Sequence, residues 1–203
     1  MKKSILQLIK NRCSIRKYKN KPVSEKKIRT VLEAGIWGPS LAQNQCFRFI
    51  IIKNKEIKNK ICNILEKYLK KLGIIGRIAF IPSTISAIQT APCLIAIYNS
   101  GEFKTMIEKF ARIRTKKKNN IYIKIAHYAE LEAIAATIQN MILTAEYYGL
   151  GTCWLQIPVY CSKQINKIFN INLELIGFLS IGYPDEKSVR SPRNKKLLLN
   201  IYK

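Results

Sequence analysis

The sequence predicts one globular domain in which helices and strands interleave. Its 203 residues are enough for a sizeable core, and its 48% hydrophobic and 24% charged residues are ordinary for a soluble globular protein. Short apolar runs with strand preference alternate with longer segments whose apolar residues recur at helical spacing. No internal repeat, low-complexity linker or shift in composition marks a boundary, so we expect residues 1–203 to form a single domain.

The first half of the chain predicts three helices and a strand. A short helix over Ser4–Lys10 precedes a second one, which begins after the N-cap residue Ser24 and ends at Gly35. Phe47–Ile52 is apolar apart from Arg48 and has strong β preference, which predicts a buried strand. Apolar residues at helical spacing over Lys55–Leu72 predict an amphipathic helix.

The second half of the chain predicts a long helix among three strands. Cys93–Tyr98 is another buried apolar run, and His127–Tyr148 is the longest segment with helical periodicity. Residues 101–124 between them are the least regular and most basic part, which we expect to be a variable covering segment. The remaining predicted elements are a strand, a short helix and a strand: Thr152–Gln156, Ser162–Phe169 and Leu175–Ile181. The basic and then apolar tail, 188–203, is expected to wrap a second subunit.

The net charge of +24 raises the question of nucleic-acid binding. Only nine of the 36 basic residues are arginine, although arginine is the residue favoured for reading bases and for bidentate phosphate contacts. The lysines are spread along the chain, and lysine, isoleucine and asparagine are enriched together, as in an AT-rich genome. We therefore do not expect nucleic acid to be a partner, while an acidic protein partner remains compatible with the charge.

Several other classes of protein find no support in the sequence. No apolar run approaches the ~20 residues that span a bilayer, and the apolar stretch near the start is too short for a signal peptide, so we expect a cytoplasmic protein without a membrane anchor. The six cysteines are scattered and His127 is the single histidine, which argues against a metal site and against a Ser/His or Cys/His hydrolase. No dinucleotide-binding glycine motif, P-loop or nucleophile elbow is present.

Two motifs contain side chains suited to binding a ligand. Arg12-Cys13-Ser14-Ile15-Arg16 places two guanidinium groups and a hydroxyl within five residues, a set of donors that suits a phosphate monoester. Gly38-Pro39-Ser40 is a turn followed by Gln43-Asn44-Gln45, and amide side chains can donate to and accept from the polar edge of a heterocycle. For the arginines the alternative interpretation is a solvated basic terminus.

The two motifs are followed later in the chain by Gly149-Leu150-Gly151-Thr152-Cys153-Trp154-Leu155 and by Gly182-Tyr183-Pro184. In this order, these segments resemble the FMN-dependent nitroreductase family from end to end. The resemblance implies an α+β sandwich with a central, mostly antiparallel sheet flanked by helices. It also implies an intertwined homodimer with two FMN molecules at the interface, each touched by both chains.

The resemblance places four segments at the cofactor. It implies that Arg12 and Ser14 hold the phosphate, that Arg16 reaches the pyrimidine side of the flavin, and that the backbone of the strand at Cys153 faces the ring. The residues implied are Arg12, Cys13, Ser14 and Arg16; Pro39, Ser40, Gln43 and Gln45; Cys153, Leu155 and Gln156; and, in the tail, Arg193 and Lys195.

The sequence shows four departures from the family pattern, one of them a pair of residues. Gln43 stands where asparagine is usual, Cys46-Phe47 replaces Pro-Trp, and Cys13 replaces a frequent second arginine. Gln156 stands where glycine is frequent, so its side chain is in a position to narrow the substrate pocket. We expect FMN binding despite these departures. They weaken the expectation that the protein acts on the family's usual nitroaromatic substrates.

The resemblance implies an FMN-dependent oxidoreductase that is reduced by NADH or NADPH and passes electrons to a small organic acceptor such as a nitro compound or quinone. Because the flavin carries the redox chemistry, no catalytic side chain is expected. One alternative keeps the fold but works as a flavin oxidase or dehydrogenase that desaturates a peptide-like or azoline substrate, with or without a partner subunit. Another is a basic binding protein without catalysis.

Overall fold

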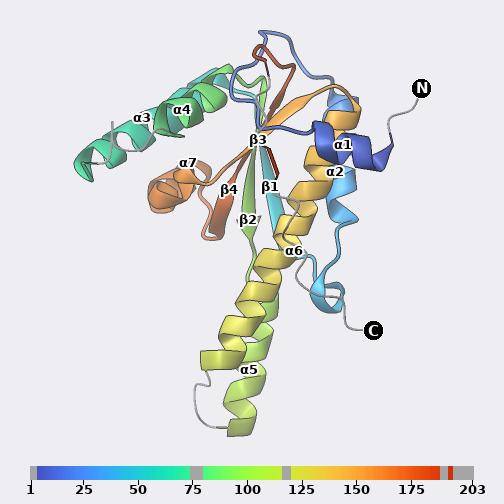
Figure 1. Cartoon of the computed structure of the whole chain (residues 1–203). Coiled ribbons are helices and arrows are strands. Elements are labelled where there is room, and N and C mark those ends of the chain that lie inside the picture. The colour runs from blue at the N-terminus through green and yellow to red at the C-terminus, as the bar shows by residue number, and fades with distance from the viewer. Residues whose placement is uncertain (1–3, 74–79, 116–119, 188–191, 194–203) are drawn as a thin grey trace.

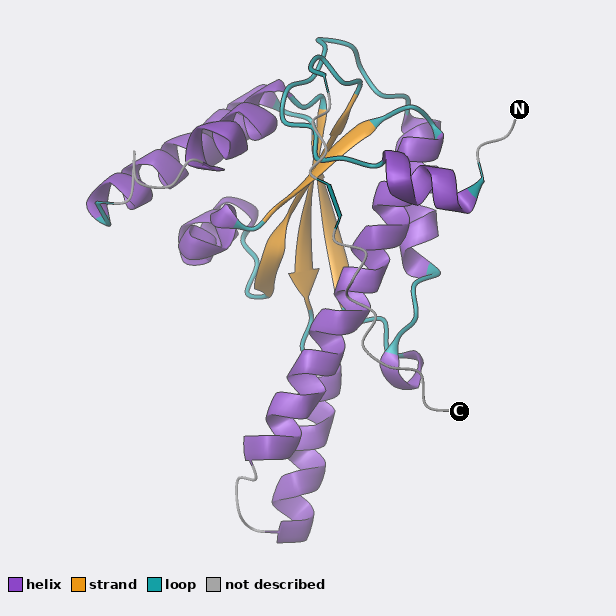
Figure 2. Cartoon of the chain, viewed as in Figure 1, coloured by secondary structure: helices purple, strands orange, loops and turns teal. Residues whose placement is uncertain are grey.

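The computed structural model describes residues 4–73, 80–115, 120–187 and 192–193. An antiparallel four-stranded sheet lies in the middle with helices on both of its faces (Figures 1 and 2). The strand order is β1-β2-β4-β3, with bounds Phe47–Ile52, Cys93–Asn99, Gly151–Leu155 and Glu174–Gly182 for β1, β2, β3 and β4. The expected α+β architecture with a central antiparallel sheet is confirmed.

One face of the sheet is covered by α3 (Lys55–Lys71), α4 (Phe80–Thr90) and α7 (Ser162–Phe169), the helices on the left in Figure 1. Leu94 and Tyr98 of β2 point into this side, as does Phe178 of β4, and all three are fully buried. The next residues along β2 point to the opposite side, as the two-residue period of a strand requires.

The other face is covered by α2 (Glu25–Ile36) and the long helix α6 (Asn120–Tyr147). Gly35 and Gly38 bring α2 and the turn after it close to α6. A Cβ on Gly35 would lie 2.8 Å from Cγ of Met141, and a Cβ on Gly38 would lie 3.0 Å from the backbone nitrogen of Thr137. Glycine at these two positions therefore permits the close packing that fixes where the following turn lies.

The described residues of the segment 101–124, which was expected to be irregular, are almost all helical. Helix α5 (Glu102–Thr115) and the first half of α6 lie side by side as an arm that extends past the end of the sheet (Figure 1). The buried carboxylate of Glu130 accepts the Lys104 N–H at 3.0 Å, so a side chain of α6 satisfies a donor in the first turn of α5. A long-range contact of this kind is invisible in local sequence.

Helix α1 (Ile5–Asn11) was predicted from the sequence, whereas α4 was not. Ser4 caps α1 by accepting the Gln7 N–H while the Gln7 side chain bonds back to the Ser4 N–H. By contrast, α4 is rich in β-branched residues and contains Pro82, which lower local helix preference. No helix in the described part of the chain is long and apolar enough to cross a membrane.

Candidate functional site

The N-terminal arginine motif lies along the free edge of β3. Ser14 forms an isolated parallel bridge with Thr152, and the Ile15 N–H donates to the Thr152 carbonyl at 2.9 Å. Gly151 makes this approach feasible, because a Cβ there would lie 2.7 Å from Cγ1 of Ile15. Strand β3 therefore holds the segment Arg12–Arg16 alongside the residues of β3 itself.

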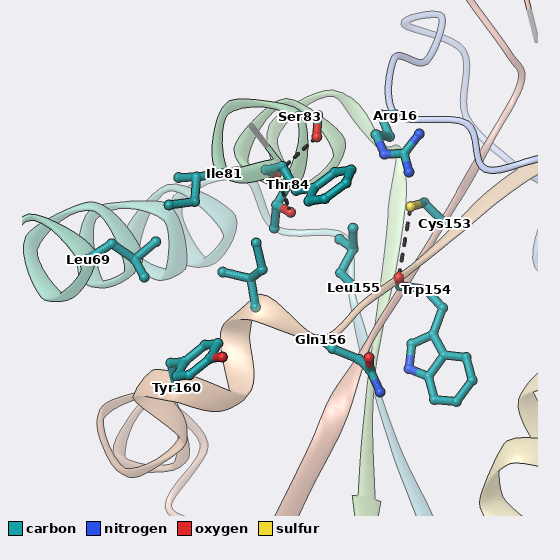
Figure 3. Close-up of a pocket in the computed structure, with 12 residues that line it drawn as sticks. Arg16, Leu69, Ile81, Ser83, Thr84, Cys153, Trp154, Leu155, Gln156 and Tyr160 are labelled. Carbon is teal, nitrogen blue, oxygen red and sulfur yellow. Dashed lines mark hydrogen bonds between the residues drawn. The ribbon is translucent and has the colours of Figure 1, made fainter. Parts of the chain in front are cut away.

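A cavity of about 270 Å³ opens between this edge of the sheet and helix α4 (Figure 3). Four of the predicted cofactor residues line it together: Arg16, Cys153, Leu155 and Gln156. Figure 3 shows the Arg16 side chain near the sulfur of Cys153, with Leu155 on the same strand. The cavity thus combines one guanidinium group with a largely apolar wall, which suits a flat ligand with a polar edge.

The two predicted phosphate ligands also lie near this wall. Burial raises the pKa of the Cys153 thiol, while the charge of Arg16, a hydrogen bond with Ser14 and the charge of Arg12 act in the opposite direction. Ser14 lies beside this wall because it bridges Thr152, the neighbour of Cys153 in β3, and Arg12 lies two residues before Ser14. Cys13 is half-buried and packs against the same core. One part of the predicted site is therefore assembled within a single chain.

The turn that carries the predicted amide side chains lies elsewhere. Gly38 packs on Thr137 of α6, and Cys46 and Phe47, which follow the turn, belong to the core on the α6 side of the sheet. Cys153 and Leu155 belong to the core on the opposite side. Within one chain, the structure therefore separates the turn residues from the cavity: Pro39, Ser40, Gln43 and Gln45.

This turn also has an unusual backbone. Ala42 and Gln43, in the short 3₁₀ helix η1 (Leu41–Gln43), both have positive φ angles, 51° and 59°. Residues with a Cβ adopt this conformation at a cost, and such strain is concentrated at functional sites. Pro39, Gln43 and Gln45 are exposed, so their side chains are free to meet a ligand or another chain.

Of the two tail residues predicted at the phosphate, Arg193 is exposed. Lys195 lies outside the described residues, as does the rest of the predicted dimer-wrapping tail apart from Pro192.

The prediction missed the outer wall of the cavity. This wall comes from α3, α4 and the 3₁₀ helix η2 (Ile157–Cys161), and it consists of Leu69, Phe80, Ile81, Ser83, Thr84, Ile157 and Tyr160. The hydroxyls of Ser83 and Thr84 donate to the Phe80 carbonyl inside α4, which leaves the wall mainly apolar. No local signal marked these residues, because α4 itself was not recognised.

Gln156 stands between two hollows. It lines the cavity described above and also a second hollow of about 520 Å³, which continues past Ile157 and Tyr160 toward Leu131 and Ile176. Its side chain is exposed, and in Figure 3 it extends away from Ile81 and Thr84 of α4. A change at Gln156 would alter the lining of both hollows. Among the described residues, no group of histidine, cysteine and acidic side chains could hold a metal ion.

Comparison with solved structures finds the same fold in other proteins. A solved BluB-like flavoprotein from Clostridium difficile 630 superposes with a TM-score of 0.83 at 21% identity, covering 99% of this chain and all of the other. A structure from Desulfovibrio desulfuricans, described as a nitroreductase in complex with FMN, gives 0.69 at 24% identity, covering both chains completely. These two likenesses show the fold.

Sequence comparison identifies the family. A Methanothermobacter thermautotrophicus protein described as an NADH dehydrogenase/NAD(P)H nitroreductase is 26% identical over 189 residues, which are 91% of this chain and 80% of that protein. The model of the nitroreductase family matches residues 9–183, from the arginine motif to the end of the sheet. The chain therefore belongs to the nitroreductase family.

Proposed function

We propose that this protein is an FMN-dependent oxidoreductase, reduced by NADH or NADPH, that passes electrons to a small organic acceptor. The observation that carries the proposal is the cavity in which Arg16 faces the apolar wall formed by Cys153 and Leu155. When bound, FMN would supply the redox chemistry by taking a hydride from the nicotinamide and passing electrons to the acceptor. The protein itself has to bind the cofactor, orient it and leave one face accessible.

The residues present fit this cofactor. Arg12 and Ser14 would hold the phosphate through charge-assisted and hydroxyl hydrogen bonds, and Arg16 would face the polar pyrimidine edge. The apolar side chains of Leu155 and Ile81 would exclude water from the ring. At about 270 Å³ the cavity is smaller than the ~300–1,000 Å³ typical of ligand pockets, so it accounts for part of the cofactor.

We propose that a second copy of the chain completes the site. The turn at 39–45 lies on the other side of the sheet, where it cannot reach the cavity of its own chain. A homodimer would bring it to the cavity of the partner. The same side of the molecule carries an apolar groove of about 620 Å³ between α1, α2 and α6, and Trp37 and Ile5 at this groove are 80% and 75% exposed. Exposed apolar side chains gathered in one groove favour an interaction surface at this place.

Purified protein tests the function directly. We expect a yellow protein with FMN absorbance that is bleached by NADH or NADPH under anaerobic conditions and recovers on addition of a quinone or nitroaromatic compound. A colourless protein that also fails to bind added FMN would contradict the proposal. Bound FMN that neither nucleotide reduces would instead favour the oxidase or dehydrogenase alternative.

A further inference from the structure

The peptide unit that leads into Arg16 is held from both sides. The Ile15 carbonyl accepts the Tyr18 hydroxyl at 2.5 Å, and the Arg16 N–H donates to Oε1 of Glu186 at 2.6 Å. Both groups belong to the same planar peptide, so its orientation is fixed by two side chains. Tyr18 comes from the same segment, and Glu186 lies 170 residues away along the chain.

The following peptide is also held by a side chain. The Arg16 carbonyl accepts the hydroxyl of Ser86, from α4, at 3.1 Å. The Asp185 N–H donates to the Lys17 carbonyl at 2.9 Å, which ties the segment after β4 to the same stretch of backbone. Three side chains from three parts of the chain therefore converge on the backbone around one residue.

These contacts leave the guanidinium group of Arg16 in the cavity. Glu186 binds the Arg16 backbone N–H, while Nη1 of Arg16 lies 3.5 Å from the Ser14 carbonyl and the side chain points toward Cys153 (Figure 3). The Tyr18 hydroxyl lies 2.8 Å from Oγ of Ser180. The Ser180 hydroxyl in turn donates to the Cys153 carbonyl at 3.3 Å. The network behind Arg16 thus also reaches the strand that forms the cavity wall.

We propose that Tyr18, Ser86 and Glu186 are positioning residues that hold the backbone of Arg16 so that its side chain is directed at the cofactor. The inference rests on the proposed FMN function. An arginine side chain loses much rotamer freedom when it binds, and a backbone fixed in advance reduces the ordering that remains. Burial raises the pKa of Tyr18, which keeps its hydroxyl protonated as a donor.

The first test compares two variants at Glu186 in the full-length apoprotein, with the Kd for FMN measured by quenching of flavin fluorescence. Glu186→Ala removes the acceptor for the Arg16 N–H, and we expect FMN binding to weaken about 3- to 10-fold, as for loss of one hydrogen bond. Glu186→Gln keeps an acceptor oxygen and should stay within about twofold of the parent. Asp185→Ala, which removes a neighbouring carboxylate, is the matched control and should leave the Kd unchanged.

The other two residues have matched controls as well. Tyr18→Phe and Ser86→Ala should each weaken FMN binding about 3- to 10-fold. Tyr98→Phe removes a buried hydroxyl that has no hydrogen-bond partner among the described residues. Thr90→Ala removes a hydroxyl bonded to the Ser86 carbonyl within α4. Neither control touches Arg16, so both should retain the parent affinity.

A double-mutant cycle separates positioning from general support of the fold. In an Arg16→Ala background, Glu186→Ala and Tyr18→Phe should cause no further loss of FMN affinity, because the group they position is absent. Full additive losses in that background, or weakening by Glu186→Gln equal to that by Glu186→Ala, would overturn the positioning role while leaving the FMN function intact. A parent apoprotein that does not bind FMN would overturn both.

Discussion

Two of the regions predicted to contact the cofactor are built in opposite ways. Residues 12–18 are locked in place by β3 on one side and by buried hydrogen bonds from Tyr18 and Ser180 behind them. Residues 39–45 form a turn with two consecutive positive φ angles, at Ala42 and Gln43, on the opposite side of the sheet. The first region contributes Arg16 to a cavity within its own chain, and the second exposes Pro39, Gln43 and Gln45.

Under the proposed function, this difference would let one small domain surround a large planar cofactor. The rigid region around Arg16 would fix the cofactor in one chain, and the strained turn would contact the cofactor bound to a second chain. Strain at Ala42 and Gln43 costs stability in the monomer, and it is retained where the conformation serves a contact. The following predictions change one region at a time, from the largest expected effect to the smallest.

Loss of Arg12 should have the largest effect on the cavity region. A charge-assisted bond to phosphate is worth roughly 1.5–3 kcal/mol, so Arg12→Ala should weaken FMN binding about 10- to 100-fold and yield largely flavin-free protein. Its backbone N–H, which bonds to the Leu8 carbonyl at the end of α1, is retained in this variant. Lys10→Ala, which removes a nearby cation, is the control. Full flavin occupancy in Arg12→Ala would contradict the phosphate assignment.

Crowding the contact between the N-terminal segment and β3 should destabilise the same region. In Gly151→Ala the new Cβ would lie 2.7 Å from Cγ1 and 2.8 Å from Cβ of Ile15, so the segment must move away from the strand. We expect a loss of about 2 kcal/mol in the free energy of unfolding, measured by urea denaturation, together with weaker FMN binding. The loss should be smaller in an Ile15→Ala background. An unchanged midpoint would show that this segment is not fixed by the strand.

Relieving the backbone strain in the turn should stabilise the protein, the opposite of the effect at Gly151. Ala42 has φ 51° and ψ 34°, a left-handed conformation that glycine adopts without the penalty of a Cβ. Ala42→Gly should therefore raise the free energy of unfolding by about 1 kcal/mol. Ala136→Gly in α6 is the control, since glycine inside a helix costs about 1 kcal/mol. If both variants were destabilised equally, the turn would carry no strain.

The smallest expected effect concerns Gln156, which lines both hollows. Gln156→Gly should raise the turnover of nitroaromatic acceptors severalfold, because a side chain beside the cavity is removed, while the flavin content stays the same. Steady-state kinetics over a panel of quinones and nitroaromatics measure this. Identical constants in both proteins would assign Gln156 a structural role alone.

Most of the fold could be predicted because its signals are local. Apart from Arg48 and the terminal Asn99, the strands at Phe47–Ile52 and Cys93–Asn99 are apolar runs, and α3 has a clear apolar stripe. Helix α4 could not be predicted, since its β-branched residues and Pro82 favour other structures and only packing makes it helical. Helix α5 depends on the distant carboxylate of Glu130.

The site could be predicted from the sequence only where local motifs mark its residues. Arg16 and Cys153 were both marked by motifs, and pairing with β3 explains why they meet. Phe80, Thr84 and Tyr160 were missed because they are ordinary residues that become a cavity wall through tertiary packing. The separation of the turn at 39–45 from the cavity also depends on tertiary structure, since sequence order does not reveal which face of the sheet a loop occupies.

The measurement that tests the two-chain site most directly uses a mixed dimer. One chain carries Arg12→Ala and Arg16→Ala, which damage the cavity region, and the other carries Ser40→Trp, which blocks the turn. Each variant alone should bind FMN poorly. The two chains are co-expressed with different tags and purified through both tags, so that every molecule contains one of each.

If each site takes its cavity from one chain and its turn from the other, the mixed dimer has one site with both defects and one intact site. We therefore predict that it binds one FMN per dimer with the affinity of the parent protein, whereas the parent binds two. A mixed dimer that binds no FMN tightly would mean that the site lies within a single chain, and it would contradict the account.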